Sequence, residues 1–181
     1  MRHYLFGLGV VALALAGCTD GKPVAQGPPP VDHEATGSPA ALEPLVMSQK
    51  PAKTVSVRDV LAMKDGEKVV VSGRTPTEKV KPFNKAVAAV LLMAPEDMER
   101  DEVKEEFDCD DAETCPACKQ LLDKYAVRVE LVDAAGAVVP ASLEGFHGLK
   151  PGSLITFEGE VKREGKDKKL VRVVAKKFYP G

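Results

Sequence analysis

The stretch Val127–Val139, VRVELVDAAGAVV, decides the fold of this chain. Apolar residues alternate with charged ones from Val127 to Leu131, which is the period of a half-buried β-strand. Asp133-Ala134-Ala135-Gly136 then indicates a turn, because Asp and Gly favour turn conformations, and Ala137–Val139 resumes the apolar pattern. The stretch therefore predicts a strand, a tight turn and a returning strand.

Strand-like runs continue on both sides of this stretch. They are rich in β-branched residues and are separated by turns that contain Gly or Pro, which is typical of an antiparallel sheet. The run 86–93 is rich in alanine, and we favour a strand there because the run is short and lies between Asn84-Lys85 and Pro95. The sequence predicts five main strands, within residues 67–75, 86–93, 125–133, 154–161 and 169–179.

Three phrases of this pattern resemble those of the OB-fold, a small five-stranded Greek-key barrel. They are VVVSGR at 69–74, VRVELVDAAGAVV at 127–139 and LKPGSLITFEGEVKRE at 149–164. With a short helical element before the fourth strand, residues 67–181 resemble OB-fold domains of the tRNA-anticodon-binding-like type and of small exported bacterial OB-fold proteins. The resemblance implies a mainly β fold. It does not cover an acidic, cysteine-containing insertion at about 95–125.

The first eighteen residues indicate export. Arg2 precedes an uncharged, largely apolar run from Tyr4 to Ala16, well short of the roughly 20 residues that span a bilayer. Leu15-Ala16-Gly17-Cys18 follows and resembles the lipobox of bacterial lipoproteins. The resemblance implies that residues 1–17 are a signal peptide and that Cys18 carries lipid. It also favours the outer membrane of the cell envelope, because Thr19 is not the aspartate linked to inner-membrane retention.

Residues 18–52 predict a disordered tether that follows the lipidated cysteine. This segment contains seven prolines with Gly, Ala and Ser and no sustained apolar period, so burial cannot offset the entropy lost on ordering. The predicted folded domain is therefore 53–181. Near its start, Ser56–Met63 indicates a short helix with Ser56 as N-cap and Asp59 at the third helical position.

The charge balance disfavours nucleic acid as a partner. The chain has 25 Lys and Arg against 27 Asp and Glu. Removal of residues 1–17 takes away only Arg2, which leaves 24 against 27 and a net charge of −3. A weakly acidic exported protein lacks the positive field that drives non-specific nucleic-acid binding. The absence of Trp and the 5% aromatic content also argue against a large stacking platform.

The insertion is strongly acidic. Eleven acidic residues lie between Glu96 and Glu113 against Arg100 and Lys104, a net charge of −9. Pro95 predicts the start of an acidic helix that runs to about Phe107, and Pro116 that of a second helix. The acidic run lacks the spacing of a calcium-binding loop, so we expect a solvated helix face.

Three cysteines remain once Cys18 is lipidated, and they support three alternatives. One pair, Cys109 with Cys115 or Cys118, could form a disulfide that stabilises the acidic loop in an oxidising compartment. Cys115-Pro116-Ala117-Cys118 at a helix start also resembles the thioredoxin redox motif, although the antiparallel pattern disfavours that fold. Finally, the three thiols with His147 could form a tetrahedral zinc site, or the thiolates could bind monovalent copper.

The closing hairpin is basic. Between Lys162 and Lys177 eight Lys and Arg residues face two acidic ones, a net charge of +6. This surface could bind an anionic ligand or phospholipid headgroups. We favour solvated strand faces, in which the lysines protect an edge or offset the acidic insertion.

Together these features predict a membrane-anchored lipoprotein of the cell envelope. Its OB-fold-like domain is expected to be a non-enzymatic module that binds an envelope protein, a cell-wall component or a small ligand. The alternative is a metal-binding or thiol-redox accessory protein that uses Cys109, Cys115 and Cys118, and a nucleic-acid-binding OB-fold is the third possibility. No catalytic residues are predicted, and no cofactor is expected apart from zinc in the alternative.

Overall fold

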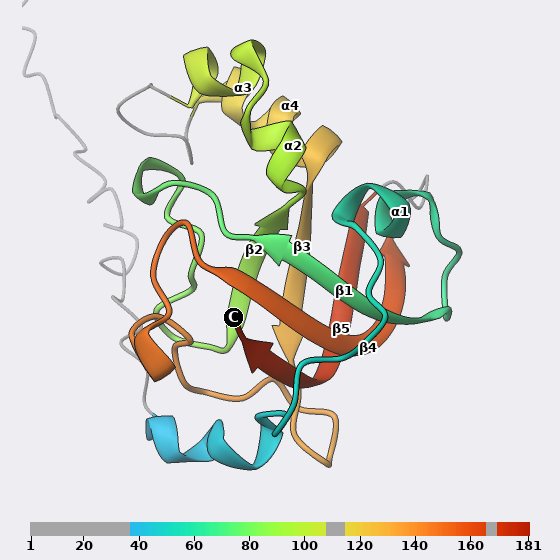
Figure 1. Ribbon diagram of the computed structural model, residues 1–181, viewed down its shortest axis with the longest axis vertical. Helices are drawn as coiled ribbons and strands as arrows, with labels where there is room; N and C mark the ends of the chain where they lie inside the picture. The colour runs from blue at the N-terminus through green and yellow to red at the C-terminus, as the bar shows by residue number, and fades with distance from the viewer. Residues whose placement is uncertain (1–36, 108–114, 166–169) are drawn as a thin grey trace, which may run out of the picture. The chain divides into compact units, whose positions relative to one another are not determined.

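The computed structural model of the protein describes residues 37–107, 115–165 and 170–181. In this part of the chain five strands are hydrogen-bonded side by side in a closed ring (Figure 1). The strands are β1 Lys68–Arg74, β2 Ala89–Met93, β3 Ala126–Leu131, β4 Leu154–Glu164 and β5 Leu170–Pro180. The prediction of a mainly β fold with five main strands is confirmed.

The strands follow the order β1-β2-β3-β5-β4 around the ring, and β4 pairs with β1. The sheet is mixed, because β3 and β5 are parallel whereas the other neighbours are antiparallel. The junction of β1 and β2 is a single residue pair, Arg74 with Met93. Next to this junction, Val55 bridges to β1 and Phe83 bridges to β2. These two segments cover strand edges that the junction leaves open.

The interior of the ring is filled by side chains that alternate along the strands. Val127, Val129 and Leu131 of β3 are fully buried, as the alternation of the sequence predicts. Phe157 of β4 and Phe178 of β5 stack with their ring centroids 5.9 Å apart. Burial of each large apolar side chain contributes roughly 1.5–3 kcal/mol to stability. This core is the main stabilising element of the ring.

Strand β4 bends at Gly159, where its register against β5 shifts by one residue. A Cβ atom at Gly159 would lie 2.3 Å from the carbonyl oxygen of Val174, so a side chain there would displace the neighbouring strand. A bulge bends a strand and increases its local twist. The bulge at Gly159 therefore helps the long strand β4 to follow the curvature of the ring.

The predicted returning strand at Ala137–Val139 is wrong. The turn before it forms as expected, with the carboxylate of Asp133 accepting hydrogen bonds from the amides of Ala135 and Ala137 at 2.9 and 3.0 Å. After the turn, only the isolated bridge between Val132 and Val138 forms. Pro140 follows at once and cannot donate to a ladder, which limits the hairpin to this bridge.

Residues 37–52 do not form the predicted tether. They make two short 3₁₀ helices, η1 Pro39–Ala41 and η2 Glu43–Leu45. Each has a proline in its first turn, where the missing amide donor is not needed. Leu42 between them is fully buried in the core of the ring. The amide of Met47 donates to the carbonyl oxygen of Phe178 at 2.7 Å. The tether prediction is therefore wrong for 37–52, and its remainder lies outside the described residues, as do the signal peptide and Cys18.

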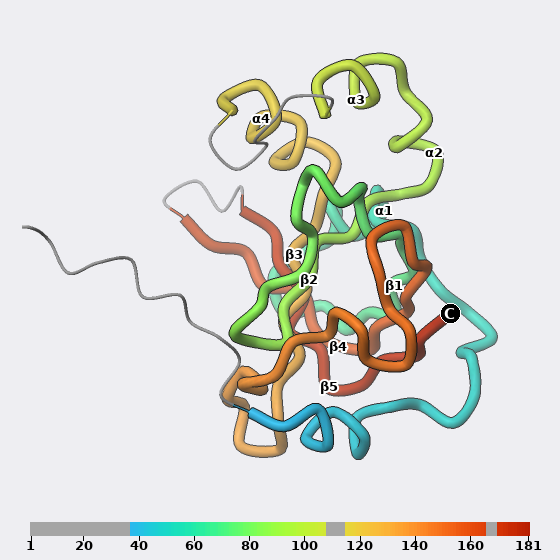
Figure 2. The backbone as a smooth tube through the Cα atoms, turned by 90° about the vertical axis from the view of Figure 1, so that its left-hand side faces the viewer, coloured from blue at the N-terminus to red at the C-terminus, as the bar shows by residue number. Residues whose placement is uncertain are grey.

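The helices α1 to α4 gather at one end of the ring (Figure 1, Figure 2). Helix α1 has Ser56 as its N-cap, as predicted, and Asp59 completes a capping box with it. The predicted acidic helix is instead two helices, because the backbone of Arg100 is extended and caps the second. No helix within the described ranges is long and apolar enough to span a bilayer. The bounds are α1 Val57–Ala62, η3 Glu78–Val80, α2 Pro95–Met98, α3 Asp101–Glu106, α4 Pro116–Tyr125 and η4 Phe146–Gly148.

Candidate functional site

The outer surface of β2 and β3 carries the candidate site. Leu91 and Arg128 lie directly opposite one another on these strands, outside the core that fills the ring. Leu91 packs instead on a second cluster of buried residues, which includes Leu121 and Tyr125 of α4. Leu91 is half-buried and the Arg128 side chain is 50% exposed. The two residues line two adjoining hollows, which together form one groove. We call this feature the outer groove.

The larger hollow of the outer groove has a volume of about 620 Å³. It lies where α4 passes into β3, opposite the tip of the β4–β5 hairpin. Its apolar lining comes from α1, α4 and β5, through Leu61, Leu122 and Leu170. Leu170 is 53% exposed and is the one large hydrophobic residue classed as exposed in the described ranges. A hollow that combines apolar side chains with a few polar ones is typical of a binding site.

The larger hollow exists because β3 and β5 separate. Their parallel pairing begins at Arg128 with Arg172 and continues to Leu131 with Ala175. Before Arg128, residues 126–127 of β3 do not pair with residues 170–171 of β5. Figure 2 shows the end of β4 and the start of β5 running away from β3 at this level. The chain thus leaves an open wedge between two neighbouring strands.

Charged side chains border the wedge and form ion pairs with one another. Glu130 is only 8% exposed and lies between two arginines. One carboxylate oxygen accepts from Arg128 Nε at 2.9 Å and the other from Arg172. Arg172 also pairs with Glu164 at 2.7 Å. The buried Nε of Arg172 has no hydrogen-bond partner within the described part of the chain. These ion pairs join β3 to β5 where the wedge begins.

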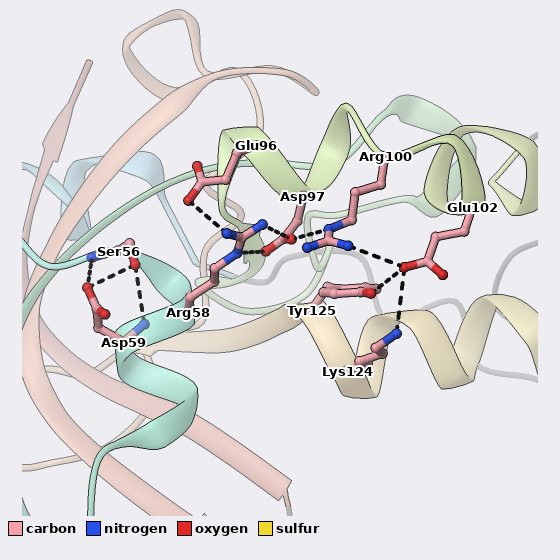
Figure 3. Close-up of polar contacts among 9 residues, drawn as sticks. All are labelled: Ser56, Arg58, Asp59, Glu96, Asp97, Arg100, Glu102, Lys124 and Tyr125. Atoms are coloured by element: carbon pink, nitrogen blue, oxygen red, sulfur yellow. Dashed lines mark hydrogen bonds and ion pairs between the residues drawn. The ribbon is translucent and has the colours of Figure 1, made fainter.

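The α4 wall of the groove is held by a polar network at the helical end of the ring (Figure 3). Asp97 is fully buried at its centre. Its carboxylate accepts from Arg58 Nε at 2.8 Å and from Arg100 Nε at 2.7 Å. The hydrogen bond from Arg58 is the main cause that holds the pKa of Asp97 below its ordinary value, whereas burial acts in the opposite direction.

A second part of the network fixes the end of α4. The Tyr125 hydroxyl donates to Glu102, and this hydrogen bond lowers the pKa of the Glu102 carboxyl. Arg100 and Lys124 both lie over the Tyr125 ring, at 5.2 and 4.6 Å from its centroid. The network joins α1 to α4 through α2 and α3. It therefore holds two walls of the groove, those that carry Leu61 and Leu122.

The structure describes two of the three candidate cysteines. Cys115 is half-buried at the start of α4, and Cys118 is buried, with its thiol donating to the carbonyl oxygen of Glu106 at 3.1 Å. No disulfide joins Cys115 to Cys118. Cys109 lies outside the described residues, and within them no group of three or more potential ligands is arranged for a metal ion.

His147 is not brought to these cysteines. It lies in η4, at the opposite end of the ring from α4 (Figure 1, Figure 2). Its Nε2 lies 3.2 Å from Glu43 Oε1, and its ring lies beside Phe146 at a centroid distance of 4.4 Å. The structure places His147 with the segment 37–47, which closes that end of the ring, rather than with the predicted zinc ligands.

Part of the basic charge on the closing hairpin has a structural role. Arg163 donates to the carbonyl oxygens of Met63 and Leu61 at 2.7 and 2.6 Å, which ties the hairpin to the end of α1. Lys162 pairs with Glu160. Lys176 and Lys177 are exposed, as expected for a solvated strand face. Residues 166–169 lie outside the described ranges.

The sequence did not single out the residues that form the outer groove. The alternation along β3 places Arg128 and Glu130 on one outward face. This pattern was the signal in the sequence that could have indicated part of the groove. Arg172 joins them through the parallel pairing of β3 with β5, which no local pattern reveals.

In comparisons with known proteins, no family model and no curated protein matches the chain.

Proposed function

We propose that this protein is a lipoprotein of the cell envelope, anchored through Cys18, and that its folded domain is a non-enzymatic OB-fold module. The strand order supports the OB-fold. Four strands lie in the order β4-β1-β2-β3, with antiparallel neighbours, which is a Greek key, and β5 joins the two ends. Five strands closed in this way are the layout of an OB-fold barrel.

The outer groove is the proposed binding surface, and the observation that carries this proposal is the exposure of Leu170 beside a hollow of about 620 Å³. The hollow combines apolar side chains with charged ones at its border, the composition of a ligand site. Its walls belong to elements that the Asp97 network and the core hold in place. A fixed groove of this kind requires little ordering when a ligand binds.

The proposed anchor places the module near a membrane. The residues between Cys18 and Gly37 number eighteen, so this segment spans at most roughly 65 Å when fully extended. The outer groove would then be available to envelope components within that distance. This proposal rests on the LAGC motif and on the apolar run before it.

Cross-linking in the cell envelope tests both parts of the proposal. A photoreactive phenylalanine derivative replaces Leu170 in the full chain, and in a matched control it replaces Ala135 in the exposed turn after β3. We expect a cross-linked product from position 170 and none from position 135. Labelled palmitate should be incorporated into the wild-type chain but not into Cys18→Ser. Equal cross-linking at both positions would overturn the binding surface, and palmitate in Cys18→Ser would overturn the anchor.

A further inference from the structure

We propose that Cys115 and Cys118 form a redox-active pair, which exchanges its two thiols for an internal disulfide by reaction with a small disulfide. This proposal goes beyond the proposed function, because it concerns the first turn of α4 and not the outer groove. The observations that carry it are the positions of the two cysteines in one helical turn and the difference in their exposure.

The two cysteines begin and end the first turn of α4. Cys115 is the N-cap of this helix of 10 residues, and the amide of Lys119 donates to its carbonyl oxygen at 3.1 Å. Cys118 is the third helical residue. Residues three apart on a helix have Cα atoms about 5 Å apart, which lies within the range of about 4.4–6.8 Å that a disulfide allows. A disulfide can therefore close across this turn.

The two cysteines differ in access. Cys115 is half-buried, whereas Cys118 is fully buried in a cluster that includes Val103 of α3 and Leu121 of α4. Cys115 also lies at the N-terminus of α4, where partial positive charge stabilises an anionic sulfur. An incoming disulfide therefore meets Cys115 first, and Cys118 reacts afterwards from inside the protein.

The reaction has two exchange steps. The Cys115 thiolate attacks one sulfur of the small disulfide, whose S–S bond breaks, and the first small thiol leaves with a proton from water. The Cys118 thiol then loses its proton to water and attacks the Cys115 sulfur. The mixed disulfide breaks, and the second small thiol leaves with a proton. Two protein thiols are oxidised and one small disulfide is reduced to two thiols.

Oxidation changes the contact between α3 and α4. In the thiol form Cys118 donates to the carbonyl oxygen of Glu106, the last residue of α3, at 3.1 Å. A sulfur in a disulfide carries no proton, so the internal disulfide removes this hydrogen bond. The pair thus connects the redox state of the protein to the packing of two helices.

The sequence before Cys115 favours a cationic disulfide. Residues 108–114 contain four acidic residues and no basic one. Negative charge attracts cations and repels anions at low ionic strength, so a cationic disulfide reaches Cys115 more readily than an anionic one. Cystamine is therefore the probe, because it carries an ammonium group at each end.

Peptide mapping of the oxidised protein tests the proposal. Residues 18–181 with Cys18→Ser are reduced, treated with cystamine and cleaved after Glu113 and Lys119. The peptide 114–119 then contains Cys115 and Cys118 without Cys109. We expect its mass to fall by that of two hydrogen atoms, and excess cysteamine should restore both thiols. A disulfide that includes Cys109, or a peptide 114–119 that keeps both thiols or stops at a mixed disulfide, would overturn the proposal.

Three variants test the order of reaction. Cys109→Ser should form the internal disulfide at a rate within about twofold of the parent chain. With Cys109→Ser, the further change Cys118→Ser should stop the reaction at one cysteamine on Cys115, while the serine hydroxyl can still donate to Glu106. The change Cys115→Ser should instead slow the reaction with cystamine at least roughly tenfold, because the buried thiol remains.

Circular dichroism checks that the three variants are folded. If Cys115→Ser reacts with cystamine as fast as the Cys109→Ser chain, Cys115 is not the attacking thiol and the proposal is wrong. These measurements do not involve the outer groove, so a failure here is distinct from a failure of the proposed function.

Discussion

Arg128 and Arg172 are register partners on the parallel strands β3 and β5, and theirs is the first pair after the two strands meet. Two like charges at directly opposed positions of neighbouring strands are unfavourable. Glu130 offsets this repulsion by accepting a hydrogen bond from each guanidinium. The triad thus marks the inner end of the wedge and holds the two strands together there.

Replacement of the central carboxylate should therefore weaken the ring. We expect Glu130→Gln to lower the free energy of unfolding by about 2 kcal/mol, because two arginines lose a charged acceptor that is nearly buried. Urea unfolding followed by circular dichroism measures the change. Glu158→Gln on the exposed face of β4 is the matched control and should change stability by less than about 0.5 kcal/mol. Equal effects would show that the triad does not stabilise the ring.

The buried Asp97 should be the most sensitive residue of the helical end. Asp97→Asn keeps the shape of the side chain but removes the charge that Arg58 and Arg100 share. We expect a loss of about 2 kcal/mol in the free energy of unfolding. Asp101→Asn makes the same chemical change at an exposed site of the insertion and should cost less than about 0.5 kcal/mol. A neutral Asp97→Asn would contradict the structural role of the network.

The contribution of Asp97 should also depend on pH. Its pKa is lower in the folded protein than its ordinary value, first because of the hydrogen bond from Arg58. The stabilisation is therefore complete above the unfolded pKa of about 3.9 and is lost as the pH falls from there through the folded pKa. The stability difference between wild type and Asp97→Asn should be constant from about pH 5 to 7 and shrink below about pH 4. A constant difference down to about pH 2 would contradict the lowered pKa.

The segment 37–52 should stabilise the domain. Leu42→Ala removes a fully buried side chain from the core and should cost about 2–4 kcal/mol. Leu45→Ala, at a half-buried position of the same segment, should cost less. A chain that begins at residue 53 should be less stable than one that begins at residue 18, as measured by urea unfolding. Equal stability of these two chains would show that the segment is dispensable.

Local patterns in the sequence were sufficient for the elements that depend on neighbouring residues. The alternation in β3 gave its buried face, and Ser56 with Asp59 gave the start of α1, because both signals act within a few residues. The segment 37–52 was missed for the opposite reason. Its apolar residues Leu42, Leu45 and Val46 lie among prolines without a helix or strand period. They pack on the core of the ring, and Val46 bridges to Phe178 of β5, which lies far along the sequence.

The outer groove was missed because it depends on strand pairing. Arg128 and Arg172 become neighbours only when β3 and β5 pair in parallel, and the wedge forms only where this pairing ends. The cysteines instead predicted a disulfide, a redox motif or a metal site, because thiols support each of these chemistries. The structure describes Cys115 and Cys118 but places His147 at the other end of the ring, so the predicted four-ligand set is not assembled among these residues.

Hydrogen–deuterium exchange is the most direct test of the outer groove as a binding site. Exchange is measured on residues 18–181 with Cys18→Ser, alone and with the envelope component that position 170 cross-links. We expect slower exchange at Leu170, Val171 and residues 126–128, with no change in the exposed turn at 134–137. Slower exchange at the separate hollow lined by Lys68 and Lys176 instead, or no change at Leu170 and Val171, would contradict the proposed site.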